Sequence, residues 1–102
     1  MSSMLESTLE QRFVRVLKKE LGLTSGKMVA VSNRGWPDRI VPLPNGRTAY
    51  IELKAPGRER RLSPHQVANH DMLRALGVPI LVTSSVREAM DFLIREMQHE
   101  AA

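Results

Sequence analysis

An Asn-Gly step between two runs of β-forming residues is the feature that most constrains the fold of this chain. The runs span residues 39–43 and 48–54, and Pro44-Asn45-Gly46-Arg47 lies between them. An Asn-Gly step between two β-type runs is a strong short-range signal for a hairpin. The two runs are therefore predicted to pair as antiparallel strands centred on this turn.

Helix and strand signals alternate along the rest of the chain. Apolar residues spaced three and four apart predict helices over residues 3–21, 63–77 and 85–98. Short β-branched runs predict further strands over residues 27–32 and 78–83. The predicted order αβββαβα is an α/β fold, with one mixed central sheet flanked by helices and a C-terminal helix added.

The composition restricts the chemistry that the chain can use. Its 102 residues are expected to form one domain, and the absence of cysteine excludes disulfides, thiolate metal sites and cysteine nucleophiles. No apolar stretch approaches a membrane span, so we expect a cytoplasmic protein without a membrane partner. The net charge of +4 understates how basic the first 85 residues are, because acidic side chains gather in the last predicted helix. Such a basic body fits nucleic acid binding without being specific to it.

The strand after the Asn-Gly turn carries the most informative side chains. Period-two alternation places Tyr50, Glu52 and Lys54 on one face and apolar residues on the other. A Glu-x-Lys pair alone is usually a solvated part of an edge strand. The hairpin, however, brings Asp38 beside Glu52 and Lys54, so that two carboxylates and an amine converge. Carboxylate oxygens suit Mg²⁺ or Mn²⁺, which would polarise a phosphodiester and activate water, while Lys54 would orient that water or offset charge on the phosphate.

The order of these residues resembles a known nuclease family. Pro37-Asp38, a hairpin and Glu52-Leu53-Lys54 are similar to the signature of the PD-(D/E)xK superfamily, whose shared core is αβββαβ. More narrowly, residues 6–83 resemble the VRR-NUC (virus-type replication-repair nuclease) domain. The segments that carry this resemblance are Gly35-Trp36-Pro37-Asp38-Arg39, Pro44-Asn45-Gly46, residues 51–57 (IELKAPG) and Ser63-Pro64-x-Gln66. The resemblance implies a metal-dependent endonuclease of the Holliday-junction-resolvase type, acting on branched or flapped DNA.

The resemblance also implies roles for single residues. Asp38, Glu52 and the backbone carbonyl of Leu53 would ligate Mg²⁺ or Mn²⁺. Lys54 would be the catalytic lysine. Gln66 would help to complete the site from the second predicted helix, although a glutamine in a first helical turn is as often simply solvated.

The family further uses a glutamate from the first helix, and this chain offers Glu6 and Glu10 on the apolar arc. Each also fits a capping box, Ser3-x-x-Glu6 or Ser7-x-x-Glu10. The Ser3 box leaves an uninterrupted helix after it. We therefore expect Glu6 to cap the helix and Glu10 to serve the site, with Glu6 as the alternative site residue.

Basic side chains near the predicted site are the expected DNA contacts. They are Arg34, Arg39, Arg58, Arg60 and Arg61. Phosphate contacts of this kind would orient a duplex without reading its sequence, although some of these arginines would simply be solvated. A catalytically silent DNA-binding module and a sequence-specific, restriction-like nuclease are the alternatives, and the small size of the chain leaves little room for base-reading elements.

The expected assembly and the remaining aromatic and histidine residues complete the analysis. Cutting two symmetric strands of a junction needs two sites, so we expect a homodimer in a bacterial or phage-infected cell. His65, His70 and His99 do not share metal-ligand spacing and are expected on the surface. Trp36 is expected to pack in the core, with DNA stacking or a subunit contact as alternatives.

Overall fold

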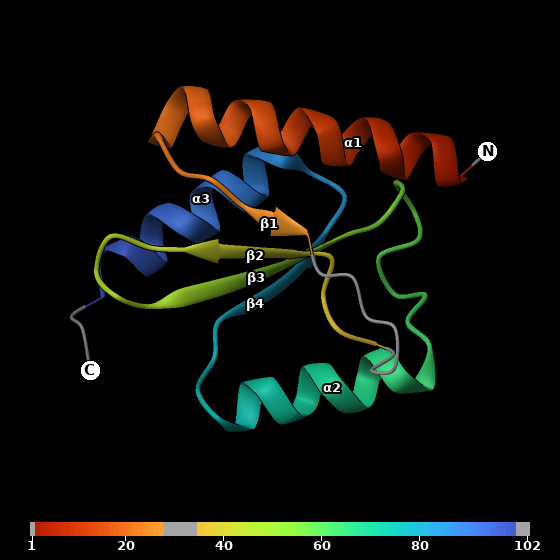
Figure 1. Ribbon diagram of the computed structural model, residues 1–102. Coiled ribbons are helices and arrows are strands. Elements are labelled where there is room, and N and C mark those ends of the chain that lie inside the picture. The colour runs from red at the N-terminus through yellow and green to blue at the C-terminus, as the bar shows by residue number, and fades with distance from the viewer. Residues whose placement is uncertain (1, 28–34, 100–102) are drawn as a thin grey trace.

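The computed structural model describes residues 2–27 and 35–99 and contains helices and strands in the predicted order (Figure 1). The helices are α1 (Ser2–Val16), α2 (Pro64–Ala75) and α3 (Val86–Met97), and α1 continues as a π-helical turn, η1 (Leu17–Leu21). The strands are β1 (Gly26–Lys27), β2 (Arg39–Pro42), β3 (Thr48–Leu53) and β4 (Ile80–Thr83). Residues 28–32, which complete the first predicted strand, lie outside the described residues.

The strands form one mixed sheet, as predicted. Its order is β1-β2-β3-β4; β2 runs antiparallel to both β1 and β3, and β4 runs parallel to β3. In the hairpin, Arg39 pairs with Ile51 and Pro42 with Thr48. Gly46 has a φ of +82°, and the Leu43 N–H donates to the Arg47 carbonyl at 2.8 Å, which closes the turn. The Asn-Gly turn thus sets the register of β2 against β3.

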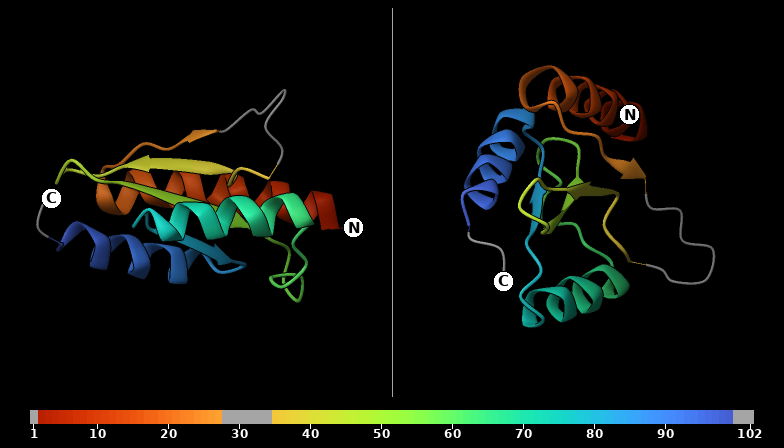
Figure 2. Two further views of the ribbon diagram at one scale, coloured as in Figure 1. Left: turned by 90° about the horizontal axis from the view of Figure 1, so that it is seen from below. Right: turned by 60° about the vertical axis from the view of Figure 1, so that its left-hand side comes forward.

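The core lies between one face of the sheet and two helices. Helices α1 and α3 contact each other and β3, whereas α2 runs beside β4, away from α1 (Figure 1 and Figure 2). Phe13, Leu17, Ile51, Met90 and Leu93 are fully buried in this core. Because side chains alternate along β3, Glu52 points away from the core that holds Ile51. That second face of β3 is the one near α2.

The first helix differs from the prediction at its end. The periodicity predicts an ordinary helix to Leu21, but the last residues form the wider π-helical turn, which keeps Leu17 fully buried. Gly22, with a φ of +67°, ends it by donating its N–H to the Lys18 carbonyl at 3.0 Å. Within the described residues, no helix combines the length and apolar character that crossing a membrane requires.

Candidate active site

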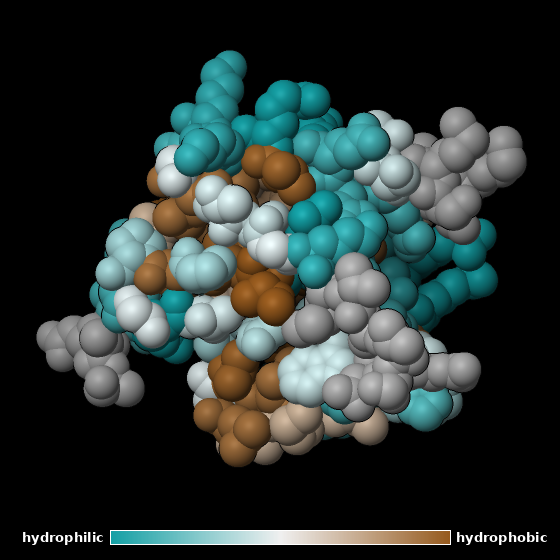
Figure 3. All heavy atoms as spheres, viewed as in Figure 1, coloured by the Kyte–Doolittle hydropathy of each residue, from teal (hydrophilic) through white to brown (hydrophobic). Residues whose placement is uncertain are grey.

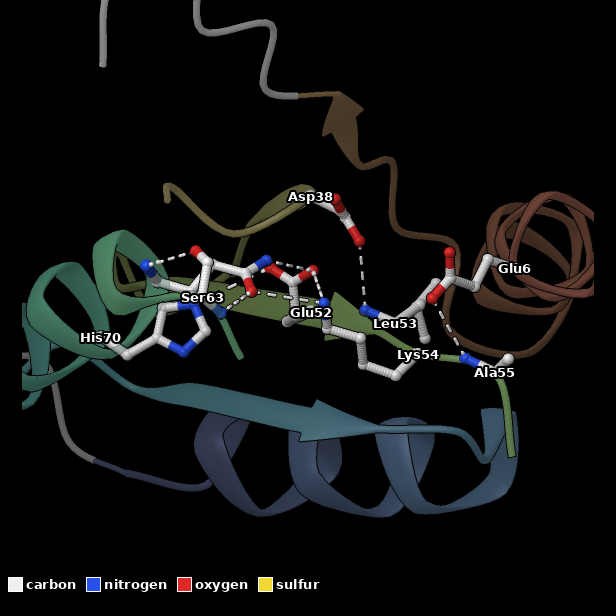
Figure 4. A network of polar contacts seen from close by, with 9 residues as sticks. Glu6, Asp38, Glu52, Leu53, Lys54, Ala55, Ser63 and His70 are labelled. Carbon is white, nitrogen blue, oxygen red and sulfur yellow. Dashed lines mark hydrogen bonds and ion pairs between the residues drawn. The ribbon is translucent and has the colours of Figure 1, made fainter. Parts of the chain in front are cut away.

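The hairpin register places Asp38 beside the end of β3. Because Arg39 pairs with Ile51, Asp38 lies across from Glu52 and Leu53. Its Oδ2 accepts a hydrogen bond from the backbone N–H of Leu53 at 3.3 Å (Figure 4). The charge of Asp38 also acts on the neighbouring carboxyl group of Glu52. The structure therefore brings the two predicted carboxylates together.

A cavity of about 380 Å³ opens over these carboxylates. Its lining residues are Glu6, Ser7, Glu10, Lys27, Asp38, Glu52, Leu53, Lys54 and Gln66. All five residues expected to have a catalytic role lie on its wall, as does the alternative glutamate. The wall is contributed by α1, β1, the loop before β2, the end of β3 and the first turn of α2.

Burial makes both carboxyl groups bind a proton more tightly than usual. Glu52 is only 2% exposed, and burial, followed by the neighbouring charge of Asp38, raises the pKa of Glu52 to about 8. Burial also raises the pKa of Asp38, although hydrogen bonds from Glu52 and the Leu53 N–H oppose that shift. Among the described residues, Glu52 Oε1 has no hydrogen-bond partner. A carboxylate pair that holds a proton so firmly also favours a bound cation.

Gln66 joins Glu52 to Lys54. Its Nε2 donates to Glu52 Oε2 at 3.4 Å, and its Oε1 accepts from Lys54 Nζ, also at 3.4 Å. A capping box at the start of α2 fixes the amide, because Gln66 Oε1 accepts from the Ser63 N–H at 2.9 Å and Ser63 Oγ accepts from the Gln66 N–H at 3.1 Å. Lys54 Nζ also lies 3.8 Å from Glu52 Oε2, and its side chain is 14% exposed.

The two glutamates of α1 have partners that differ from those expected. Helix α1 begins at Ser2, so Ser3 lies inside the helix, and the predicted capping role of Glu6 is wrong. Glu6 Oε1 instead accepts a hydrogen bond from the Ala55 N–H at 3.3 Å, just after β3 (Figure 4). The charge of Glu6 also contributes to the raised pKa of Glu52.

Glu10 is engaged by two cations. Its Oε1 lies 2.9 Å from Arg39 Nη2 and 3.4 Å from Lys27 Nζ. The charge of Glu10 still contributes to the raised pKa of Asp38. The Arg39 side chain is 15% exposed and is the partner of Glu10, so the expected DNA contact from Arg39 stays a prediction.

The other predicted DNA-binding arginines divide into two groups. Arg58, Arg60 and Arg61 are exposed on the loop between β3 and α2, whereas Arg34 lies outside the described residues. The loop is tied to the residue after β4, because the Ser84 hydroxyl donates a hydrogen bond to the Glu59 carboxylate. This bond lowers the pKa of Glu59.

The prediction that His70 lies on the surface is wrong. His70 is fully buried, and its Nε2 lies 3.8 Å from Glu52 Oε1. Gln66, His70 and Leu73 are spaced four and three residues apart and share the face of α2 that turns to the sheet. That spacing is the sequence signal that would have found His70. His65 and His99 are exposed, as predicted.

The loop before Asp38 packs through its proline. Pro37 is fully buried, while Trp36 is only half-buried, so the prediction that Trp36 lies in the core is wrong. Burial of the Pro37 ring thus anchors the chain directly before Asp38. Trp36 keeps part of its surface open to solvent.

The oxygen atoms of this cavity can contribute to a divalent-metal site. In residues 2–27 and 35–99, no three His, Asp or Glu side chains gather closely enough to hold an ion by themselves. Asp38 and Glu52 can supply two ligands, and the Leu53 carbonyl is adjacent. Mg²⁺ commonly uses one or two carboxylates and retains several water ligands, so this donor set fits it.

Comparisons with known proteins place the chain in a family. No protein-family model matches the sequence. A protein of Acyrthosiphon pisum secondary endosymbiont phage 1, described as "Putative nuclease p44", is 39% identical over 80 residues, which are 78% of this chain and 83% of the phage protein. A solved structure described as "VRR_NUC domain" matches with a TM-score of 0.71 and 24% identity, over 93% of this chain and 98% of the other. This chain therefore belongs to the family of the phage protein and has the fold of the VRR-NUC domain, as its motifs predict.

Proposed function

We propose that this protein is a Mg²⁺- or Mn²⁺-dependent endonuclease that hydrolyses phosphodiester bonds in branched DNA. The observation that carries the proposal is the buried pair Asp38 and Glu52, beside the amine of Lys54 in an open cavity. Two carboxylates repel a phosphate, so a module that only binds DNA has no need to place them there. The name of the phage relative supports the same reaction class.

Asp38, Glu52 and the carbonyl of Leu53 would hold the ion. The ion would polarise the phosphodiester and lower the pKa of a bound water molecule. The Leu53 N–H holds Asp38 Oδ2, so the residue that offers its carbonyl also orients the opposite carboxylate. A bound cation would give Glu52 Oε1 a partner, because this atom has no hydrogen bond among the described residues. It would also favour the charged form of Glu52, whose pKa is raised in the metal-free protein.

Glu6 is the better candidate for the carboxylate contributed by α1. The negative charge of Glu10 is compensated by Arg39 and Lys27. The Glu6 carboxylate instead accepts a hydrogen bond from the Ala55 N–H, beside the end of β3. Because no three acidic or histidine side chains converge among the described residues, Glu6 would act through a water molecule of the metal shell. Glu10 would keep Arg39 and Lys27 in place at the rim.

Lys54 would act on the phosphate or on the attacking water. Its amine is held between Gln66 Oε1 and Glu52 Oε2, at 3.4 Å and 3.8 Å, so it needs little reorganisation when a phosphate arrives. Its positive charge would offset the negative charge that develops on the phosphate oxygens. Gln66 would keep both Lys54 and Glu52 oriented, through the capping box of α2.

The DNA would approach along the loop between β3 and α2. Arg58, Arg60 and Arg61 are exposed there, and contacts from them to phosphates would be salt-sensitive and independent of sequence. The chain is short, so there is little room beyond the core for elements that could enter a groove and read bases. Selectivity for DNA structure is therefore the better proposal than selectivity for sequence.

A homodimer would supply the second site that symmetric cutting of a junction needs. Helix α2 exposes apolar side chains, with Val67 44%, Met72 39% and Leu76 71% exposed. Apolar atoms gather along the edge of the molecule where α2 runs (Figure 3). Light scattering on purified protein tests the dimer. The bacterial or phage-infected cytoplasm is the proposed place of action.

The test of this function is cleavage of labelled four-way junction, flap, duplex and single-stranded DNA, each with Mg²⁺, Mn²⁺ or EDTA. Lys54→Ala is the catalytic variant, and Lys19→Ala, which removes an exposed lysine from η1, is the matched control. We expect metal-dependent cutting of the branched substrates by the wild type and Lys19→Ala, and none by Lys54→Ala. Salt-sensitive binding without cutting under any metal would instead identify a silent DNA-binding module.

A further inference from the structure

His70 and Glu52 are buried, and they face each other through polar atoms that lack a hydrogen bond. His70 of α2 is 0% exposed, and among the described residues neither of its ring nitrogens has a hydrogen-bond partner. Its Nε2 lies 3.8 Å from Oε1 of Glu52, the carboxylate oxygen that also lacks a hydrogen bond (Figure 4). Buried polar groups without partners are rare and call for an explanation.

The other oxygen of Glu52 is already occupied. Gln66 Nε2 donates to Glu52 Oε2 at 3.4 Å, and Lys54 Nζ lies 3.8 Å from the same atom. His70 is therefore the polar group that faces the remaining side of the carboxylate. Gln66 and His70 lie about one helical turn apart on α2, so residues on a single face of this helix lie next to both oxygens of Glu52.

We propose that His70 is a positioning residue that donates a hydrogen bond from Nε2 to Glu52 Oε1 and fixes the orientation of this carboxylate for the metal. The proposal rests on the proposed function, because it concerns the same site. A contact about 1 Å shorter than the present 3.8 Å would be an ordinary hydrogen bond. Groups that hold a metal-ligating carboxylate from behind typically change metal affinity about 10- to 100-fold when removed.

The role needs a ring nitrogen that carries a proton. A neutral imidazole has one N–H, and the proposed contact places that proton on Nε2. His65 and His99 are exposed and provide an internal reference in the same protein.

A histidine that only fills space predicts a different outcome. Methionine has a similar size and no polar hydrogen, so His70→Met removes two unpaired nitrogens from a buried position. On either account the metal-free variant should be as stable as the wild type or more stable. Only the positioning role predicts that this equally stable variant binds metal more weakly.

The experiment measures Mn²⁺ dissociation constants by calorimetry, without DNA. The proteins are the wild type, His70→Met, His70→Gln, Asp38→Ala and Leu73→Ala, the last of which loosens the same face of α2 without removing a group from the site. We expect His70→Met to bind Mn²⁺ about 10-fold or more weakly. His70→Gln, whose amide can donate in the same direction, should recover much of the loss, and Leu73→Ala should bind Mn²⁺ as the wild type does.

A second measurement does not depend on metal. Long-range ¹H–¹⁵N spectra of the metal-free wild type should show His70 as the neutral ring with its proton on Nε2. A proton on Nδ1, or unchanged Mn²⁺ affinity in His70→Met while Asp38→Ala loses it, would overturn the role of His70 and leave the proposed function standing. A wild type that binds no Mn²⁺, or an Asp38→Ala variant that binds it equally well, would overturn both.

Discussion

A β-carbon built on Gly35 would lie 2.3 Å from the backbone carbonyl carbon of His65, which is closer than such atoms can approach. Gly35 also has a φ of +88°, which other residues adopt only at a cost. At this close approach, the loop that leads to Asp38 packs against the first turn of α2, and that turn carries Gln66. The absence of a side chain at Gly35 thus helps to set the distance between two walls of the site.

Replacing Gly35 by alanine should therefore lower the free energy of unfolding by more than backbone strain alone would. Gly57 has a similar φ of +85° with open space around its α-carbon, so Gly57→Ala reports the strain without the clash. We expect Gly57→Ala to lose about 1–2 kcal/mol of unfolding free energy and Gly35→Ala to lose about 1–3 kcal/mol more. Urea unfolding measures both. Equal losses of unfolding free energy would show that the contact between Gly35 and His65 does not constrain the loop.

The two glutamates of α1 should separate stability from metal binding. Glu10→Gln removes the negative charge that compensates the buried Arg39 guanidinium 2.9 Å away, and we expect a loss of roughly 1–3 kcal/mol in unfolding free energy. Glu6→Gln should change stability little but weaken Mn²⁺ binding and cleavage. Urea unfolding and calorimetry on both variants test this. The reverse pattern would return the site role to Glu10, as the sequence alone predicts.

The metal-free protein should lose stability as the pH rises. The folded state raises the pKa of Glu52 from its ordinary value of 4.5 to about 8, so it binds this proton more tightly than the unfolded chain does. The resulting stabilisation is complete below about pH 4.5 and disappears as the pH rises through about 8. Glu52→Gln removes this titration and should be the more stable protein above pH 8.

Thermal melting in EDTA between pH 4 and 9 measures this effect. His70 acts in the opposite sense, because its lowered pKa costs stability as the pH falls below 6.5. The stabilities of wild type and Glu52→Gln are therefore compared above about pH 7, where the titration of His70 adds little. Mn²⁺ should restore the lost stability at high pH. A difference that stays constant across the range would contradict the buried, proton-binding carboxylate pair.

The loop that carries Arg58, Arg60 and Arg61 should depend on an acidic residue. Glu59→Gln removes a negative charge, so charge alone predicts tighter DNA binding. The Glu59 carboxylate, however, accepts the Ser84 hydroxyl and ties the loop to the end of β4. We therefore expect Ser84→Ala to weaken DNA binding several-fold. We expect Glu59→Gln to weaken it as well, because a neutral amide oxygen accepts the Ser84 hydroxyl less strongly than a carboxylate does.

Fluorescence anisotropy in EDTA measures that binding without cleavage. Glu88→Gln, which removes an exposed charge from α3, is the matched control and should bind as the wild type or slightly better. Tighter binding by Glu59→Gln would mean that the tie to Ser84 does not order the arginines. Absence of any binding by the wild type would argue against the DNA substrate itself.

The parts of the site that local rules determine could be predicted from the sequence. The Asn45-Gly46 turn fixes the register, and the register alone brings Asp38 to Glu52. Strand alternation separates Glu52 from the core side chain of Ile51. The Ser63-Pro64 start of α2 places Gln66 in the first turn, where the capping box holds it.

The parts that depend on packing between distant elements could not be predicted. The pairing of Glu10 with Arg39 needs the position of α1 over β2, which no local pattern contains. The Ser3-x-x-Glu6 pattern predicts a helix cap, but α1 starts at Ser2, so Glu6 lies within the helix instead of capping it. The burial of His70 could not be predicted because α2 has few apolar residues on its buried face. Its apolar residues Val67 and Leu76 are exposed instead.

The most direct test of the central claim is single-turnover cleavage of a labelled four-way junction in Mg²⁺ by the wild type and Lys54→Ala, with binding to the same junction measured in EDTA. The account predicts equal binding within about 2-fold and a cleavage rate at least about 100-fold lower in Lys54→Ala, because that amine stabilises charge that develops on the phosphate. Equal cleavage by the two proteins, or a wild type that binds the junction and never cuts it, would contradict the proposed nuclease site.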